Sequence, residues 1–224
     1  SCRTSTDRAA AYAGRGDEDR HLALSKIEEL GADVPHVVWE SGGETVYQLR
    51  LLHITFGEDW RGGNEGLAHL KDVRDAYEVI LDCAEIDDAG LQHVAEMRPL
   101  GGLTCNRTII TDAGLKSVSG VQDLRSIQLN GSQITDAGLA ALSGHKLMWL
   151  LVDNAAQITD AGLIHLAHMD DLISLRLNGA QLTGSGLAHL DKLQQLRALD
   201  LSGTQIDDDG LAHVARFPRL RRLP

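Results

Sequence analysis

Apolar and polar residues follow one another along this chain in blocks that return at a fixed interval. A glycine just before a leucine marks most blocks, and these glycines are 24 residues apart: Gly66, Gly90, Gly114, Gly138, Gly162, Gly186 and Gly210. The pattern L-x-x-L-x-L, or a close variant, precedes most of them. A constant period of this length predicts a solenoid in which every unit is the same supersecondary element.

The L-x-x-L-x-L segments predict short strands whose alternate residues point inward. In one unit the inward residues are Leu124, Ile127 and Leu129. The segment "LMWLLV" begins one residue early, at Leu147, and the longer turn "DNAAQI" then restores the phase. We therefore expect this strand to be displaced in the sequence while the helices stay aligned.

The phrase "TDAGL" predicts the start of a helix. Thr111, Thr135 and Thr159 lie where an N-cap oxygen is needed, and the aspartate after each suits the positive end of the helix dipole. Apolar residues three apart then share one helix face, which packs against the strand leucines. One unit cannot bury that face alone, so neighbouring units must share a continuous core.

These residues resemble the leucine-rich repeat family. "ITDAGLxxL" after "LxxLxL" is similar to the cysteine-containing subtype of F-box adaptors, and more similar to arrays common in planctomycete bacteria. The resemblance implies an α/β solenoid, a right-handed horseshoe with a parallel sheet on the concave face and α-helices on the convex face. The family's usual Asn or Cys ladder position is small or polar here, so we expect the loops to depend on backbone pairing.

The chain divides into three predicted segments. Residues 1–18 are polar and charged, which is typical of a flexible tether. Residues 19–60 predict a capping helix, with Leu22, Ile27 and Leu30 at helical spacing, followed by strands. Residues 61–224 form the array of 24-residue units. The capping segment is expected to shield the first open edge of the core.

Charge and composition narrow the function. The net charge of -11 repels phosphate backbones, so we expect no nucleic-acid partner. No apolar run is long enough for a membrane helix. The sequence has no nucleophile elbow, P-loop, zincin or paired-cysteine motif, so we expect neither an enzyme nor a cofactor.

The outward positions of the strands are free of the demands of the core and therefore carry the functional information. On the concave face we expect a ligand-binding surface made of Glu78, Ile80, Thr104, Gln128, Trp149, Leu151, Arg176 and Asp200. Trp149 and Leu151 form an apolar pair at its centre, beside a groove opened by Gly101 and Gly102. Such a surface favours a non-enzymatic module that binds a protein or peptide. The alternative is that Trp149 only packs on Gln128 or Arg176.

Two other patterns leave alternatives open. Histidines recur three residues after the repeat glycine, and His165, His168 and His189 are weak candidates for a metal site. We expect no metal, because the histidines are repeat vocabulary on half-exposed helix faces. The cluster Arg216, Arg219, Arg221 and Arg222 discourages edge-to-edge pairing, and docking of an acidic partner is its other interpretation.

The three cysteines are too scattered for a disulfide scaffold. Cys105 takes an inward position, whereas Cys83 lies in a turn. Cys2 before a polar tether resembles the mature end of a bacterial lipoprotein. Lipidation there would make the chain a cell-envelope structural or adhesion protein, which is the alternative function. The compartment stays open, with the envelope or periplasm favoured over the cytoplasm.

Overall fold

The computed structural model describes residues 15–34, 38–41, 44–47, 53–74, 76–83, 85–130 and 133–224. Its first part contains α2 (Arg15–Glu29), β1 (Val38–Ser41), β2 (Glu44–Tyr47), β3 (His53–Phe56), α3 (Gly63–Gly66) and the 3-10 helix η1 (Leu67–Asp72). The following units contain β4 (Glu78–Leu81), α4 (Asp88–Val94), β5 (Gly102–Asn106), α5 (Asp112–Val118), β6 (Ser126–Asn130) and α6 (Asp136–Leu142). The last units contain β7 (Trp149–Asp153), η2 (Asp160–Leu166), β8 (Ser174–Leu177), η3 (Ser185–Leu190), β9 (Ala198–Asp200) and α7 (Asp208–Val214).

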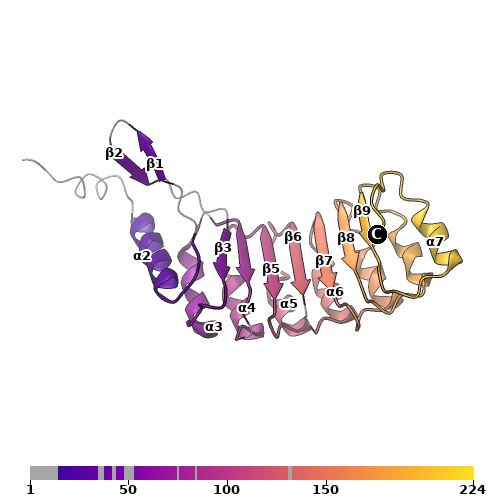
Figure 1. Cartoon of the computed structure of the whole chain (residues 1–224), viewed down its shortest axis with the longest axis horizontal. Helices are drawn as coiled ribbons and strands as arrows, with labels where there is room; N and C mark the ends of the chain where they lie inside the picture. Colours follow the sequence, from indigo (N-terminus) through magenta and orange to yellow (C-terminus); the bar gives the residue numbers. More distant parts are fainter. Residues whose placement is uncertain are drawn as a thin grey trace, which may run out of the picture.

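Strands β3 to β9 form one parallel sheet with the helices as a second layer beside it, while β1 and β2 pair antiparallel in a separate two-stranded sheet. The sheet has seven strands in the order β3-β4-β5-β6-β7-β8-β9, which is also their order in the chain. Figure 1 shows the strands in a row, with α4, α5 and α6 along one side of them. This arrangement confirms the predicted α/β solenoid. No helix within the described ranges is long and apolar enough to cross a membrane.

The core is continuous from unit to unit, as the repeated leucines predict. Leu124, Ile127 and Leu129 are completely buried. The displaced strand keeps its register, because Leu150 pairs with Ile127 on one side and with Leu175 on the other. The loss of one residue before β7 is therefore absorbed outside the sheet, as expected.

The displaced unit also contains the one buried histidine among the described residues, His145. It lies 24 residues after the buried Val121 and 24 residues before the buried Met169, in a position that is otherwise apolar. Its Nδ1 is 3.2 Å from the carbonyl oxygen of Leu142 and its Nε2 is 3.1 Å from that of Val118. The imidazole therefore joins two successive units through their backbones.

A side-chain ladder joins the units where the helices begin, at a surface that we call the helix-start edge. Asp112 accepts hydrogen bonds from the N–H and the hydroxyl of Thr135, at 2.9 and 2.7 Å. The Thr135 hydroxyl in turn accepts a hydrogen bond from the Ala137 N–H at 3.1 Å. The same carboxylate–threonine contact recurs between Asp88 and Thr111, Asp136 and Thr159, and Asp160 and Thr183.

This ladder corrects one expectation and explains the repeated glycine. The loops do not depend on backbone pairing alone, because each aspartate bonds the threonine of the next unit. A Cβ on Gly138 would lie 2.4 Å from the Asp112 Oδ1 atom, and one on Gly114 would lie 2.3 Å from the Asp88 Oδ1 atom. The glycine is small because the carboxylate of the preceding unit occupies its surroundings.

The helices differ from the prediction in type. The threonine caps at positions 111, 135 and 159 are confirmed, each accepting a hydrogen bond from the N–H two residues later. Three elements, η1, η2 and η3, are nevertheless 3-10 helices. At η3 the sequence has Gly184 and Ser185 where other units have aspartate and alanine, and the capping position has no side-chain hydrogen bond.

Helix α2 covers the first unit of the array. It begins at Arg15, so the last four residues of the expected tether, 15–18, are helical, and residues 1–14 lie outside the described residues. Ala23, Leu24 and Ile27 are buried, whereas Leu22, expected on the packed face, is 70% exposed. Gly31 ends the segment with φ +100°, and a Cβ there would meet the Asp59 carbonyl oxygen at 2.0 Å.

Candidate functional site

The outward residues of the strands form two columns on the open side of the sheet, which we call the strand face. The parallel register places Glu78, Gly102, Ser126, Trp149, Ser174 and Ala198 in the first column. It places Ile80, Thr104, Gln128, Leu151, Arg176 and Asp200 in the second column. All the expected surface residues therefore lie on one face, on neighbouring strands.

Trp149 protrudes from the first column because its neighbours there are small. Ser126 and Ser174 flank it in register. Its side chain is 40% exposed, whereas the next residue of β7, Leu150, is completely buried. Gln128 and Arg176 are paired with Leu151 instead, so the large residues expected to cover the indole belong to the other column.

Arg176 lies between two carboxylates of its own sheet. Its Nη1 is 3.5 Å from Asp153 Oδ2 and its Nε is 3.3 Å from Asp200 Oδ2. Hydrogen bonds from Ser202 and the charge of Arg176 lower the pKa of the Asp200 carboxyl, although desolvation opposes them. Arg176 is therefore held in place and partly neutralised, rather than being a free cation.

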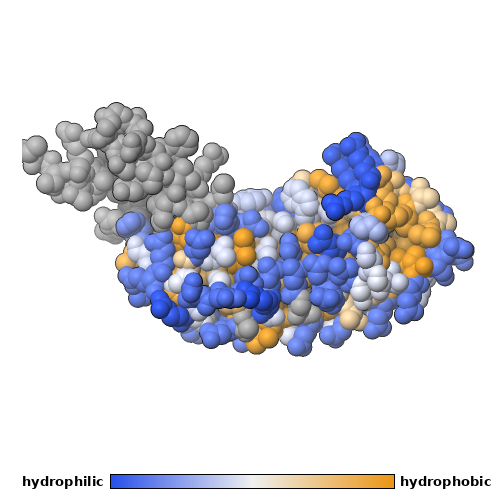
Figure 2. Space-filling model, in the orientation of Figure 1, coloured by the Kyte–Doolittle hydropathy of each residue, from blue (hydrophilic) through white to orange (hydrophobic). Residues whose placement is uncertain are grey.

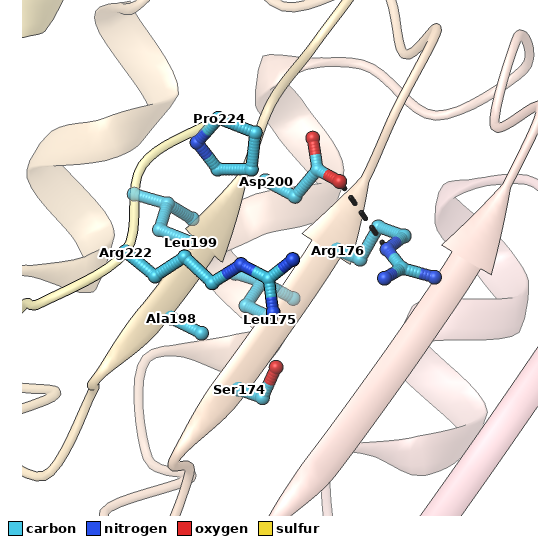
Figure 3. A pocket seen from close by; sticks show the side chains of 8 residues that line it. All are labelled: Ser174, Leu175, Arg176, Ala198, Leu199, Asp200, Arg222 and Pro224. Atoms are coloured by element: carbon cyan, nitrogen blue, oxygen red, sulfur yellow. Dashed lines mark ion pairs between the residues drawn. The ribbon is translucent and has the colours of Figure 1, made fainter.

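A small hollow lies on the strand face around these residues, near the C-terminal end of the sheet. Its volume is about 60 Å³, and it is lined by Ser174, Leu175, Arg176, Ala198, Leu199, Asp200, Arg222 and Pro224. Figure 3 shows the ion pair of Asp200 with Arg176 on one side, while Arg222 extends over the strands from the other side. The hollow is too small for a drug-sized ligand.

The N-terminal part of the strand face is more polar than the C-terminal part, and side chains fill the space there. Thr104 donates a hydrogen bond to Glu78 at 3.5 Å. The expected groove at Gly101 is absent, because a Cβ there would lie 1.9 Å from the ring of Tyr77. The glycine makes room for this tyrosine, which is 49% exposed and which the strand pattern did not identify.

The remaining candidate residues do not converge on a chemical site. In the part of the chain that the structure describes, no three histidine, cysteine or acidic side chains come together to hold a metal ion. His165 is half-buried, and His168 and His189 are exposed. His213 lies 3.2 Å from a carboxylate oxygen of Asp191 instead.

The cysteines divide by burial. Cys105 is completely buried, and burial raises the pKa of its thiol strongly. Cys83 is half-buried, and desolvation likewise raises the pKa of its thiol. Neither thiol is activated as a nucleophile, which needs a lowered pKa. Cys2 lies outside the described residues, so the lipid anchor stays a prediction.

Polar and apolar side chains are mixed over the strand face as a whole. Figure 2 shows hydrophilic and hydrophobic residues interspersed over most of this side, with apolar surface gathered towards the C-terminal end. A surface of this kind, with one aromatic side chain above small neighbours, is typical of protein recognition. The hollow beside Arg176, of about 60 Å³, is much smaller than the pockets that small-molecule enzymes use.

Comparisons with known proteins agree with this fold. The family described as "Leucine Rich repeat" matches residues 122–143 and 192–215. An internalin (inlF) from Listeria monocytogenes is 21% identical, with a TM-score of 0.53 over 70% of this chain and 49% of its own. The chain therefore spans about half of that protein.

An internalin C2 (inlC2) from the same organism is 19% identical, with a TM-score of 0.57 over 92% of this chain and 93% of its own. No curated protein matches the chain. Both internalins are less than 25% identical to this chain, so the likeness to them shows the fold alone. The sequence period, the sheet and these likenesses show that the fold of the chain is that of a leucine-rich repeat solenoid.

Proposed function

We propose that the protein binds a protein or peptide partner through its strand face, with Trp149 and Leu151 at the centre. The observation that carries the proposal is the exposed indole of Trp149 among small neighbours in the middle of the sheet. Exposed aromatic residues are enriched among the residues that dominate binding energy. Such recognition depends on the shape and polarity of side chains that the rigid sheet holds in place. It requires no covalent chemistry.

The neighbouring residues fit distinct roles in such an interface. Leu151 extends the apolar centre, and Gln128 supplies a polar contact beside it. Arg176 is pre-positioned by Asp153 and Asp200, so little side-chain entropy is lost when a partner accepts its remaining donors. Glu78, Ile80 and Thr104 would form the N-terminal rim of the interface. The likeness to planctomycete-type arrays is likewise a proposal, because only the repeat phrase supports it.

A peptide selected from a random library on the immobilised wild-type protein provides the probe. We expect Trp149→Ala to weaken that peptide by about tenfold or more, since truncating a central aromatic anchor commonly has this effect. The matched control is Ile164→Ala, because Ile164 is 51% exposed on η2, on the helix side. Isothermal titration calorimetry measures both.

Arg176→Glu tests the polar part of the same site. It replaces the paired cation by a third carboxylate beside Asp153 and Asp200, so we expect weaker binding than for wild type. If the selected peptides bind Trp149→Ala and Arg176→Glu as tightly as the wild type, the strand face is not the binding surface.

A further inference from the structure

A second surface runs beside the strand face, at the end of the sheet where the strands begin. We call it the leading edge, and it consists of the residues immediately before the strand positions: Arg125, Met148, Ile173, Arg197 and Arg221. From Met148 onward, each N–H donates to the carbonyl of the preceding member, at 2.7 Å for Met148 to Arg125 and 2.8 Å for Arg197 to Ile173. The backbone bonds therefore hold these residues side by side across successive units.

Two adjoining hollows lie along the leading edge and share Arg197. The first, of about 350 Å³, is lined by Arg125, Met148, Asp171, Ile173, Gln195 and Arg197. The second, of about 390 Å³, is lined by Arg197, Pro218, Arg219, Leu220 and Arg221. Together they form a shallow trough that is large enough for several side chains of an extended peptide.

The arginines of this trough lack acidic partners, in contrast to three arginines elsewhere in the described part of the chain. Arg107, Arg176 and Arg216 each form an ion pair with at least one carboxylate. Over the described ranges, Arg197 and Arg221 are exposed and form no ion pair with any carboxylate within 4.0 Å.

Neighbouring side chains add to this positive charge. Arg219 bonds the neutral oxygen of Gln195, which leaves its charge uncompensated. Arg222 is exposed and extends over the strands towards the strand face (Figure 3). Asp171 is the one acidic residue among those that line the two hollows. Although the chain has a net charge of -11, arginine side chains without acidic partners are concentrated at this trough.

The trough is apolar at its centre. Met148 and Ile173 are half-buried and lie between Arg125 and Arg197 along the edge. Met148 also precedes Trp149, so the apolar part of the trough is continuous with the centre of the strand face. Adjacent strands are about 4.8 Å apart, so the pattern of one cation, two apolar residues and two cations spans roughly four strand spacings.

We propose that the leading edge binds an acidic peptide segment of a partner protein, with an apolar side chain over Met148 and Ile173 and carboxylates at Arg197 and Arg221. Guanidinium groups match carboxylates through paired N–H donors, and a free guanidinium gains more from a new carboxylate than a paired one. The complementary charges also accelerate the encounter.

Other polyanions fit this trough less well. A nucleic acid or an anionic membrane is large, so it would also face the negative charge of the remaining surface. A short acidic peptide contacts the cations alone. Its apolar residue additionally uses Met148 and Ile173, which a phosphate backbone leaves uncovered.

The test is fluorescence anisotropy with a labelled peptide in which glutamates flank a central leucine. We expect it to bind the full chain at low salt, and to bind Arg197→Glu/Arg221→Glu at least about tenfold more weakly. A peptide with glutamine in place of each glutamate should bind the wild-type protein no more tightly than the glutamate peptide binds the double variant. Binding should weaken as salt is added, because exposed charge pairs are screened.

The matched control is Lys71→Glu/Lys116→Glu, which changes the net charge by the same amount on exposed residues of η1 and α5 on the helix side. We expect it to bind the acidic peptide within about twofold of wild type. An equal loss in this control, undiminished binding by the leading-edge variant, or equal binding of the glutamine peptide would overturn the proposal.

Two further arms separate other anions from the peptide. A fluorescent single-stranded oligonucleotide and vesicles containing phosphatidylserine should bind the wild type more weakly than the glutamate peptide does. Tighter binding of either one, lost in Arg197→Glu/Arg221→Glu, would assign the edge to that anion and overturn the peptide. Circular dichroism establishes that each variant is folded.

This inference extends the proposed function but is tested apart from it. Trp149→Ala should leave the glutamate peptide bound within about threefold, because the cations of the trough remain. If the selected peptides fail to depend on Trp149 while the glutamate peptide still requires Arg197 and Arg221, only the strand-face proposal fails. The reverse result removes the leading edge alone.

Discussion

At the helix-start edge the same side chains meet in unit after unit, whereas on the strand face no two units present the same pair. Asp112 bonds Thr135 as Asp136 bonds Thr159, with distances that agree within 0.1 Å. Across the sheet, Trp149 lies between serines and Arg176 lies beside Leu151. Both surfaces are partly exposed, so burial does not explain the contrast.

The difference shows what repetition means in a solenoid. A contact between units must be made identically at every junction, so the residues that make it recur with the period. An outward strand residue contacts no obligatory partner, so its identity is free to serve recognition. Residues that recur with the period therefore indicate contacts that stabilise the fold. Residues that differ from unit to unit indicate function. The predictions that follow separate the two kinds by their effect on the free energy of unfolding.

Leu150→Ala should have the largest effect. Leu150 is completely buried within the sheet, and its truncation removes core contacts of three adjacent units. We expect the free energy of unfolding to fall by about 3 kcal/mol. Urea denaturation followed by circular dichroism measures it, and a loss below about 1 kcal/mol would contradict a shared core.

Gly138→Ala should be the next most damaging change. The new Cβ would lie 2.4 Å from Asp112 Oδ1 and 2.5 Å from Ile134 Cγ2, so either the ladder or the helix must shift. We expect a loss of about 2 kcal/mol in the same denaturation experiment.

Gly120→Ala is the control for this change, because no atom lies within 4 Å of its Cβ position. It should change the free energy of unfolding by less than about 0.5 kcal/mol. Gly120 lies in the turn after α5, so equal effects of the two substitutions would mean that the loss of glycine's backbone freedom, and not contact with the ladder, determines the cost.

Asp160→Asn should have a smaller, pH-dependent effect. Desolvation raises the pKa of Asp160, but hydrogen bonds from Thr183 and Gly186 outweigh it and leave the pKa lowered. A lowered pKa in the folded state stabilises the protein above the unfolded value of about 4, and this contribution is lost as the pH falls through the folded pKa.

We therefore expect Asp160→Asn to cost about 1 kcal/mol at neutral pH and almost nothing well below the pKa of the carboxyl group. Denaturation over a pH series measures both. Asp170→Asn is the control, because Asp170 is exposed and its side chain makes no hydrogen bond with any of the described residues. A loss for Asp160→Asn that is the same at every pH would exclude the charge as its cause.

The period of the sequence is enough to predict the core and the register. Leu150 and Leu175 could be placed inward because apolar side chains at alternate positions need a common interior. The capping threonines could be placed as well, because a helix start needs a local acceptor. These inferences depend on interactions within one unit or on a demand that all units share.

Contacts between particular units could not be predicted in the same way. The aspartate of the phrase was interpreted through its own helix dipole, although it also bonds Thr135 or its equivalents in the next unit. The ion pairs of Arg176 depend on which strand ends lie beside it. The pattern of strand positions did not identify Met148 and Arg197, because they precede the first outward residue; the sequence indicated only the C-terminal arginines of the leading edge.

Trp149→Ala should have the smallest effect on stability, although Trp149 is larger than any residue considered above. Its indole is 40% exposed and its column neighbours are serines, so truncation leaves no cavity and no unsatisfied partner. We expect the free energy of unfolding to change by less than about 0.5 kcal/mol, as for most surface substitutions. Leu150→Ala, one residue along the same strand, provides the comparison in the same urea series. A loss for Trp149→Ala that approaches that of Leu150→Ala would show that the indole packs on the sheet, and it would remove the reason for assigning recognition to this face.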